Sequence, residues 1–266
     1  MADLYSIETL SLSLADMTAK PLFGAAPHIQ ILRGLSFTIP RGAVVGIVGG
    51  SGSGKSTLGR ALVRLLEPSG GQIRFDGTDI THLPEAALRP LRRRFQMIFQ
   101  DPMSSLNPRH RVGTIIAEPL RLHGFQAIPD RVARALEQVG LPQSFVTRYP
   151  HELSGGQRQR VGIARAIALE PDFILADEIV SGLDVSSQAQ VLNLLERLVR
   201  DLGLTLAFIS HDLSVIRRLC QRTIVLHRGE IVEDRPTADL FADPQAAYTR
   251  ELLEAIPLPD PAQVWT

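Results

Sequence analysis

Short apolar runs alternate with longer amphipathic segments along most of the chain. The short runs predict strands at 5–14, 29–39, 43–48, 96–99, 173–176, 205–209, 223–227 and 230–234, with a hairpin-like piece at 72–76. Apolar positions that recur every three or four residues predict helices at 55–66, 84–93, 156–168, 186–201 and 213–220. Strands alternating with helices are typical of a mostly parallel sheet covered on both faces. The pattern therefore predicts an α/β fold.

The middle of the chain departs from this alternation. From Asp101 to about Pro150 no strong strand pattern occurs, and the apolar spacing in 112–122 and 131–139 is helical. We therefore expect a helical insertion in the α/β domain. The last ten residues contain three prolines and predict an extended tail.

Composition narrows the possible partners and chemistry. Lys and Arg together number 28, as do Asp and Glu, so net charge gives no reason to expect a nucleic acid or an anionic membrane as partner. The single cysteine, Cys220, excludes an internal disulfide framework and a cysteine cluster, and its apolar surroundings favour a buried side chain. We find no secretory signal and no run of roughly 18 apolar residues that could span a membrane. If the protein acts at a membrane, we expect it to bind from the cytoplasmic side through another chain.

A glycine-rich loop lies between the predicted strand 43–48 and the predicted helix 55–66. It fits G-x-x-x-x-G-K-[ST] and consists of Gly49, Gly50, Ser51, Gly52, Ser53, Gly54, Lys55, Ser56 and Thr57. Glycines let successive N–H groups curl around an anion at the positive end of a helix. Lys55 is expected to reach the β- and γ-phosphates, Ser56 to bind Mg²⁺ and Thr57 to bond the α-phosphate. A flexible linker would share the composition but not the strand–loop–helix context. The loop predicts nucleotide binding, which kinases, GTPases, helicases and transport ATPases share.

Two acids, Asp177 and Glu178, end the predicted strand 173–176. Strand burial does not explain acids at the carboxyl edge, where α/β sheets bind ligands. Asp177 suits the coordination shell of Mg²⁺, and Glu178 is the candidate to polarise the attacking water. Two solvated acids that open a loop are the alternative explanation.

A second glycine-containing helix start precedes the predicted helix 156–168. Leu153 is followed by Ser154, Gly155, Gly156 and Gln157. Such a group offers N–H donors and the positive end of a helix to an anion. A simple serine N-cap is the alternative, but it does not explain two phosphate-type helix starts in one chain.

With these motifs the sequence resembles the ATP-binding cassette (ABC) ATPases, whose signature motif is this pentapeptide at this spacing before the acid pair. The resemblance implies a P-loop NTPase with a mostly parallel core sheet, an N-terminal antiparallel β subdomain and an inserted helical subdomain. It places the ATPase core at 1–100 and 154–235, the helical subdomain at 101–153 and a C-terminal extension at 236–266. The implied cofactors are ATP and Mg²⁺.

The resemblance also assigns further residues of the site. Gln100 corresponds to the glutamine that contacts Mg²⁺ and the lytic water, and His211 to the histidine that contacts the γ-phosphate. Asp184 corresponds to an acid at the seam between two cassettes. In the family the signature and this acid act on the nucleotide of the partner cassette, which implies that role for Ser154, Gly155, Gly156, Gln157 and Asp184. Phe23 is the candidate to stack on adenine, with an ordinary loop residue as the alternative.

Four positions depart from the usual family pattern. Ile179 and Val180 stand where Pro and then Thr or Val usually follow the acid pair, Gly182 replaces a common Ala, and Gly50 stands where Glu or Pro is frequent. No departure removes a group that contacts phosphate, metal or water. We therefore expect ATP hydrolysis to be retained, at a rate that can differ from that of other family members.

Several stretches look like the peptide/nickel import branch of the family: 99–108, 149–152, 183–186, 188–195 and 248–257, although Ala246-Ala247 replace the usual His-Pro. Those bacterial importers pair two ATPase chains, usually different, on two membrane subunits and receive solute from a periplasmic binding protein. The resemblance thus implies a peripheral protein at the cytoplasmic face of the inner membrane. The solute contacts other chains, so this sequence does not identify it.

Two other classes share the catalytic motifs. The ATPase of an ABC exporter or lipoprotein-release system differs only in the stretches just given. DNA-maintenance ABC ATPases place a long coiled coil before the signature, and segment 58–152 has no sustained heptads. Basic residues at 89 and 92–94 are better explained as a solvated helix end than as a nucleic-acid patch.

Overall fold

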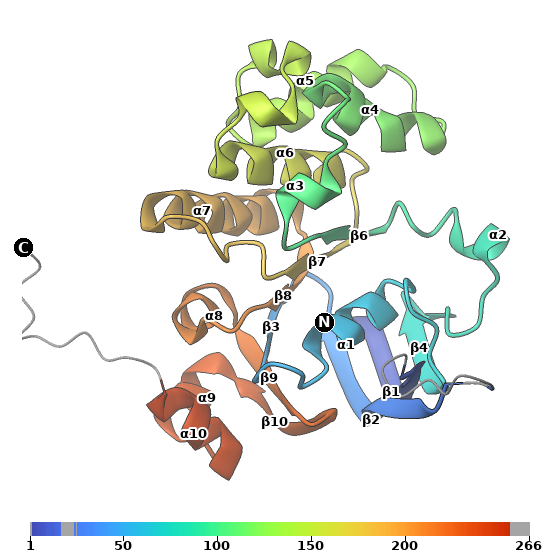
Figure 1. The fold of residues 1–266 in the computed structure, drawn as a ribbon, viewed down its shortest axis with the longest axis vertical. Coiled ribbons are helices and arrows are strands. Elements are labelled where there is room, and N and C mark those ends of the chain that lie inside the picture. Colours follow the sequence, from blue (N-terminus) through green and yellow to red (C-terminus); the bar gives the residue numbers. More distant parts are fainter. Residues whose placement is uncertain (1, 17–23, 25, 256–266) are drawn as a thin grey trace, which may run out of the picture.

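A six-stranded sheet forms the centre of the protein, whose computed structural model describes residues 2–16, 24 and 26–255. Its strands are β3 (Val44–Val48), β6 (Phe95–Ile98), β7 (Phe173–Asp177), β8 (Thr205–Ile209), β9 (Arg222–His227) and β10 (Glu230–Pro236). They lie in the order β10-β9-β3-β8-β7-β6 (Figure 1). Every pairing is parallel except that of β10 with β9. The predicted mostly parallel core sheet is confirmed.

A second, antiparallel sheet packs beside the first. It contains β1 (Asp3–Ala15), β2 (His28–Pro40), β4 (Gly70–Phe75) and β5 (Thr78–Asp79) in the order β2-β1-β4-β5. Helix α1 (Lys55–Leu62) lies between the two sheets (Figure 1). Its Leu58 and Leu62 pack into one apolar cluster with residues of both sheets. The β subdomain implied by the resemblance is therefore present.

The core strands separate two hydrophobic clusters. In β3, Val45 and Ile47 join the cluster of α1 and the antiparallel sheet, whereas Val44 and Val48 join the cluster beneath the helices. Successive side chains of a strand point to opposite faces, so both faces of β3 are buried. This explains why the strand is a continuous apolar run and not an alternating one.

The segment between β6 and the signature is helical. It contains α3 (Pro102–Ser105), α4 (Val112–Leu122), α5 (Ile128–Gln138) and the short 3-10 helices η1 (Gln143–Thr147) and η2 (Pro150–Glu152). These pack with α6 (Gly155–Ile167) and α7 (Val185–Leu202) in the upper part of Figure 1. The predicted insertion is therefore helical. Its boundaries at 101–153 stay a prediction.

Two helix ends differ from the expected ones. The helix expected at 84–93 is only α2 (Glu85–Leu88), because Pro90 lacks an N–H group and disfavours helical backbone before it. The helix expected at 55–66 ends at Leu62, and Arg64 has a positive φ of 52°.

The chain continues after α8 (Leu213–Leu219) and the β9–β10 hairpin with two helices that the sequence pattern did not predict, α9 (Thr237–Ala242) and α10 (Ala247–Glu254). The expected extended tail lies outside the described residues. Cys220 is buried as expected, and burial raises the pKa of its thiol.

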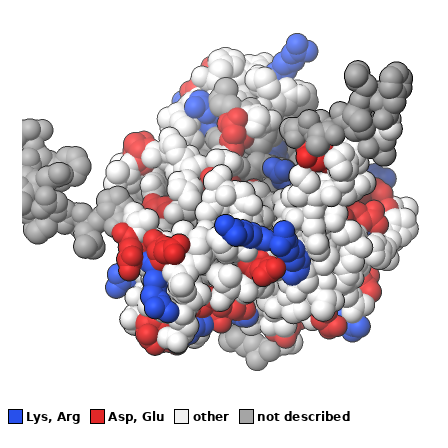
Figure 2. All heavy atoms as spheres, turned by 60° about the horizontal axis from the view of Figure 1, so that its bottom comes forward, with Lys and Arg blue, Asp and Glu red and all other residues white. Residues whose placement is uncertain are grey.

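Figure 2 shows basic and acidic side chains interspersed on the face that it presents. Among the described residues no helix has the length and apolar character needed to cross a bilayer.

Candidate active site

The glycine-rich loop connects the end of β3 to the start of α1 at the carboxyl edge of the core sheet. Gly49 has a φ of 149°, and a Cβ atom there would lie 2.2 Å from the carbonyl oxygen of Leu226. Only glycine fits at that position, since any side chain would collide with backbone. Gly54, with a φ of 104°, precedes α1 and supplies no side-chain cap to it. The first N–H groups of α1 thus remain available to an anion.

Lys55 lies inside this loop. It is buried, and its Nζ donates hydrogen bonds of 2.8 Å to the carbonyl oxygens of Gly49 and Gly50. Burial lowers the pKa of Lys55, while the charges of Glu178 and Asp177 act to raise it. Ser53 Oγ is also buried, and it has no hydrogen-bond partner in the described part of the chain. A buried ammonium and an unpaired hydroxyl beside an uncapped helix start fit a bound phosphate chain.

Ser56 and Asp177 form a pair of oxygen donors below the loop. Ser56 Oγ donates to Asp177 Oδ1 at 3.1 Å, and Asp177 is only 4% exposed. Burial raises the pKa of Asp177, partly opposed by the hydrogen bond from Ser56. A buried carboxylate beside a hydroxyl fits Mg²⁺, which prefers oxygen ligands and would offset the cost of the buried charge.

Glu178 is the point at which three predicted residues meet. Gln100 Nε2 donates to Glu178 Oε2 at 3.1 Å, and His211 Nδ1 lies 3.4 Å from the same oxygen. Glu178 has a positive φ of 49°, and its N–H donates to the carbonyl oxygen of Ile209 at 2.9 Å. Strained backbone of this kind persists where the surrounding structure fixes it, and often occurs at functional sites. The ends of β6, β7 and β8 thus bring together an acid, an amide and an imidazole.

The residues assigned to a partner's nucleotide form a separate group. Ser154 caps α6: its Oγ accepts from the N–H of Gln157 at 3.3 Å, and the Gln157 side chain accepts from the N–H of Ser154 at 3.0 Å. Asp184 caps α7 by accepting from the N–H of Ser187 at 2.9 Å. Within the described residues, no hydrogen bond joins this group to the phosphate loop. The serine N-cap that the sequence offered as an alternative is therefore present at the signature.

The departures from the family pattern leave the core intact. Ile179 and Val180 are buried and belong to the cluster beneath the helices. Phe23, the candidate for adenine stacking, lies outside the described residues.

One contact at the loop was missed by the sequence analysis. The N–H of Gly50 donates to Tyr248 Oη at 2.7 Å. The sequence marked Tyr248 only as part of a family-like stretch, and no local pattern connects two residues 198 positions apart.

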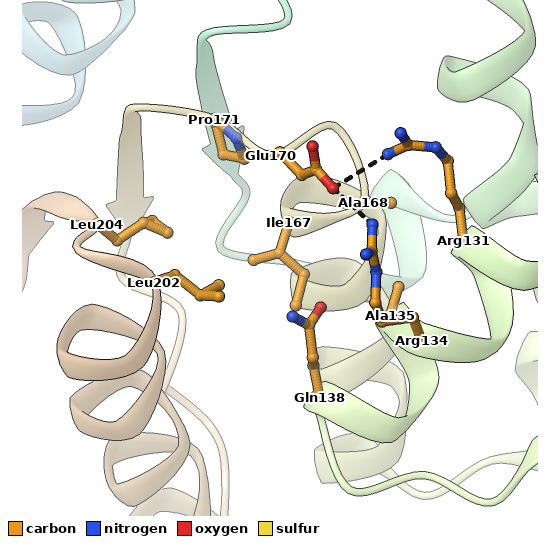
Figure 3. A pocket seen from close by; sticks show the side chains of 10 residues that line it. All are labelled: Arg131, Arg134, Ala135, Gln138, Ile167, Ala168, Glu170, Pro171, Leu202 and Leu204. Atoms are coloured by element: carbon orange, nitrogen blue, oxygen red, sulfur yellow. Dashed lines mark hydrogen bonds and ion pairs between the residues drawn. The ribbon is translucent and has the colours of Figure 1, made fainter. Parts of the chain in front are cut away.

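A pocket of about 300 Å³ lies elsewhere, between α5, the end of α6 and the end of α7 (Figure 3). Glu170 accepts from Arg131 at 3.1 Å and from Arg134 at 2.5 Å at its rim, and Leu202 and Leu204 line its far side. None of the assigned site residues lines this pocket.

Comparisons with known proteins agree with this geometry. A sequence model of the ABC transporter family matches residues 32–181. A putative peptide import ATP-binding protein of Brucella ovis is 55% identical over 258 residues, which cover 92% of this chain and 81% of the relative. The glutathione import ATP-binding protein GsiA of Salmonella typhi is 50% identical over 239 residues, covering 89% of this chain and 38% of that longer protein.

Solved structures with the same fold are also found. The dimeric ATP-binding cassette MJ0796 bound to ADP and Pi has a TM-score of 0.77 and 28% identity, covering 88% of this chain and 98% of its own. CbiO1 from Clostridium perfringens, part of the cbiONQ transporter complex, has a TM-score of 0.78 and 27% identity, covering 91% of this chain and 92% of its own.

Proposed function

Since the chain belongs to the ABC transporter family and is one of its ATPases, we propose that it powers a bacterial importer of peptides or a related small solute. The observation that carries the catalytic part is the meeting of Gln100 and His211 on Glu178, next to the buried pair of Ser56 and Asp177. The import part is supported by the names of the relatives, which are peptide and glutathione import proteins.

Phosphoryl transfer depends mainly on positioning and on charge stabilisation. MgATP supplies the reactive γ-phosphate and the charge of the metal ion. Residues 49–57 enclose the phosphates, with the uncapped N–H groups at the start of α1 as donors, and Lys55 adds a positive charge. Ser56, Asp177 and Gln100 would hold Mg²⁺ through their side-chain oxygens.

Glu178 orients the attacking water and accepts a hydrogen bond from it, because its carboxylate stands at the sheet edge beside the loop. Gln100 and His211 fix the orientation of that carboxylate, with His211 also reaching the γ-phosphate. In this assignment the strained backbone of Glu178 holds the acid at the reaction centre.

A second cassette completes each nucleotide site. Ser154, Gly155, Gly156, Gln157 and Asp184 have no hydrogen bond to the chain's own phosphate loop among the described residues, which suits a role toward a partner's ATP. The first-turn N–H groups of Gly155 and Gly156 have no acceptor within α6 and offer donors for a phosphate. The dimeric state of MJ0796 supports such an arrangement.

Membrane subunits would bind in a groove of about 480 Å³ between β6 and α4. Its lining is mixed polar and apolar, and the exposed fractions of Leu65, Phe99 and Leu122 are 50%, 38% and 60%. Exposed apolar side chains of this size mark a protein interface. The proposed place of action is the cytoplasmic face of the inner membrane, with two permease subunits, a second cassette and a solute-binding protein.

Uptake measurements test the import role. A strain lacking this chain would be complemented with the wild-type gene or with Glu178→Gln, and uptake of radiolabelled peptides and glutathione would be compared. Wild type should restore uptake of one of these solutes, and Glu178→Gln should not. Equal uptake in all three strains would contradict the proposal.

A further inference from the structure

Tyr248 connects the C-terminal helix α10 to the phosphate loop. Its Oη accepts the N–H of Gly50 at 2.7 Å, and its half-buried ring packs against the core. The ring of His227, the last residue of β9, packs against the ring of Tyr248, with 3.8 Å between the two ring centroids. The hydroxyl is therefore held at the loop by packing.

Residue 50 is shaped to receive this hydroxyl. A Cβ atom on Gly50 would lie 2.8 Å from Tyr248 Oη, closer than such atoms approach each other. The missing side chain leaves room for the hydroxyl, and the free N–H supplies its donor. Proline, frequent at this position in the family, would lack that donor.

The helix that carries Tyr248 is itself anchored. Glu233 of β10 has a side chain only 4% exposed, and it accepts the N–H groups of Gln245 and Ala246 at 3.0 Å each. Burial acts to raise the pKa of Glu233, but these donors hold it below its ordinary value. An ionised carboxylate thus binds the backbone at the start of α10 and places Tyr248 one residue inside the helix.

The first half of the loop is held from two sides. Lys55 Nζ binds the carbonyl oxygens of Gly49 and Gly50 from inside, and Tyr248 binds the Gly50 N–H from outside. When nucleotide binds and the Lys55 ammonium moves from these carbonyl oxygens to the phosphates, the hydrogen bond to Tyr248 still fixes the peptide plane between Gly49 and Gly50.

We propose that Tyr248 is a positioning residue for the phosphate loop, through which the seating of α10 on β10 sets the affinity for ATP. This inference rests on the proposed assignment of residues 49–57 to the phosphates. Tyr248 need not contact the nucleotide, because it acts through the backbone of Gly50.

The test is Tyr248→Phe in the full-length chain, which keeps the ring on His227 and removes the hydroxyl. Loss of one hydrogen bond that orders the loop should raise the Kd for the non-hydrolysed analogue AMP-PNP with Mg²⁺, and the KM for ATP, about three- to tenfold. The kcat should stay within about twofold, since the bond is made equally in ground and transition states. Calorimetry and steady-state ATPase assays measure these values.

A double-mutant cycle with Gly50→Ala separates this role from general destabilisation. Gly50→Ala displaces the hydroxyl and should raise the Kd by itself, but it should add little on the Tyr248→Phe background, because both changes remove the same bond. Additive losses would overturn the inference.

Tyr5→Phe is the matched control. Its hydroxyl donates to the carbonyl oxygen of Leu62 at the end of α1, away from the loop. It should lower the melting temperature and leave the Kd unchanged. Glu233→Gln should raise the Kd in the same direction as Tyr248→Phe, and the two should not add.

An unchanged Kd in Tyr248→Phe would overturn the inference and leave the proposed function standing. Absence of AMP-PNP binding to the wild-type chain would instead contradict the assignment of the phosphate loop, and the inference with it.

Discussion

Helices α1 and α6 both start with glycine-containing segments, yet α1 has no side-chain cap whereas α6 caps itself through Ser154 and Gln157. Around α1 the chain gathers a buried lysine, a buried aspartate and a glutamate with two polar partners. Around α6 the cap is exposed, and its hydrogen bonds among the described residues stay within its own helix.

The difference shows how one motif type serves two situations. A helix start that is uncapped and surrounded by charges within the same chain is prepared for a ligand there. A capped helix start is already stable in the isolated chain, and at the surface it is accessible to a ligand that is bound to another molecule. Five substitutions test this contrast.

Glu178→Gln should have the largest effect. It keeps the shape of the side chain but removes the base, so turnover should fall about 10²- to 10⁴-fold while MgATP binding is retained. The measurements are steady-state ATPase assays and calorimetric titration. Glu170→Gln, in the pocket of Figure 3, is the control and should keep wild-type turnover. Turnover within a few-fold of wild type for Glu178→Gln would contradict its role.

Gly155→Asp should separate the two helix starts. A Cβ atom at Gly155 would lie 3.5 Å from Leu183, an ordinary contact, so the chain should fold. The new carboxylate would repel a partner's phosphate, and turnover should fall about a hundredfold. The Kd of the isolated chain for MgATP should not change, and a weakened Kd would place this helix start at the chain's own nucleotide.

Asp177→Asn should stabilise the nucleotide-free chain. Burial raises the pKa of Asp177, so its ionised form is less favourable in the folded than in the unfolded chain. Stability therefore falls as pH rises from the unfolded pKa through the folded pKa, and the penalty is fully present above the folded pKa. The substitution should raise the melting temperature by about 2–4 °C and abolish the further rise caused by MgATP. A lower melting temperature without nucleotide would contradict this.

Two serine-to-alanine substitutions should have the smallest effects, and they compare the two helix starts directly. Ser154→Ala removes a cap and should lower the free energy of unfolding by about 1 kcal/mol. Ser53→Ala, in the loop before α1, removes a buried hydroxyl that has no hydrogen-bond partner in the described part of the chain, and it should cost nothing or slightly stabilise the chain. Urea unfolding of both variants measures the difference, and equal losses would refute it.

The sequence predicted the features of the fold and site that depend on residues close together in the chain. Strands β3, β7 and β8 were predicted because burial on both faces makes them continuous apolar runs, and residues 49–57 form a contiguous motif. The contacts of Gln100 and His211 with Glu178 follow from strand ends that share one sheet edge. The family resemblance supplied the roles of these residues.

What the sequence did not predict depends on tertiary placement. Helix α10 begins after Ala246 without a side-chain cap, and it is positioned by the carboxylate of Glu233 on another element. The contact of Tyr248 with Gly50 requires that β9, β10 and α10 first assemble beside β3. No periodicity within a short window carries that information.

The division of the core strands between two apolar clusters has a consequence for local opening. Amides of β3, β7 and β8 are covered on both sides and should exchange with solvent only when the whole domain unfolds. Helix α10 exposes much of its surface and should open far more often. The phosphate loop thus begins at a strand that should open only with the whole domain, and it is contacted by a helix that should open more readily despite its anchor at Glu233.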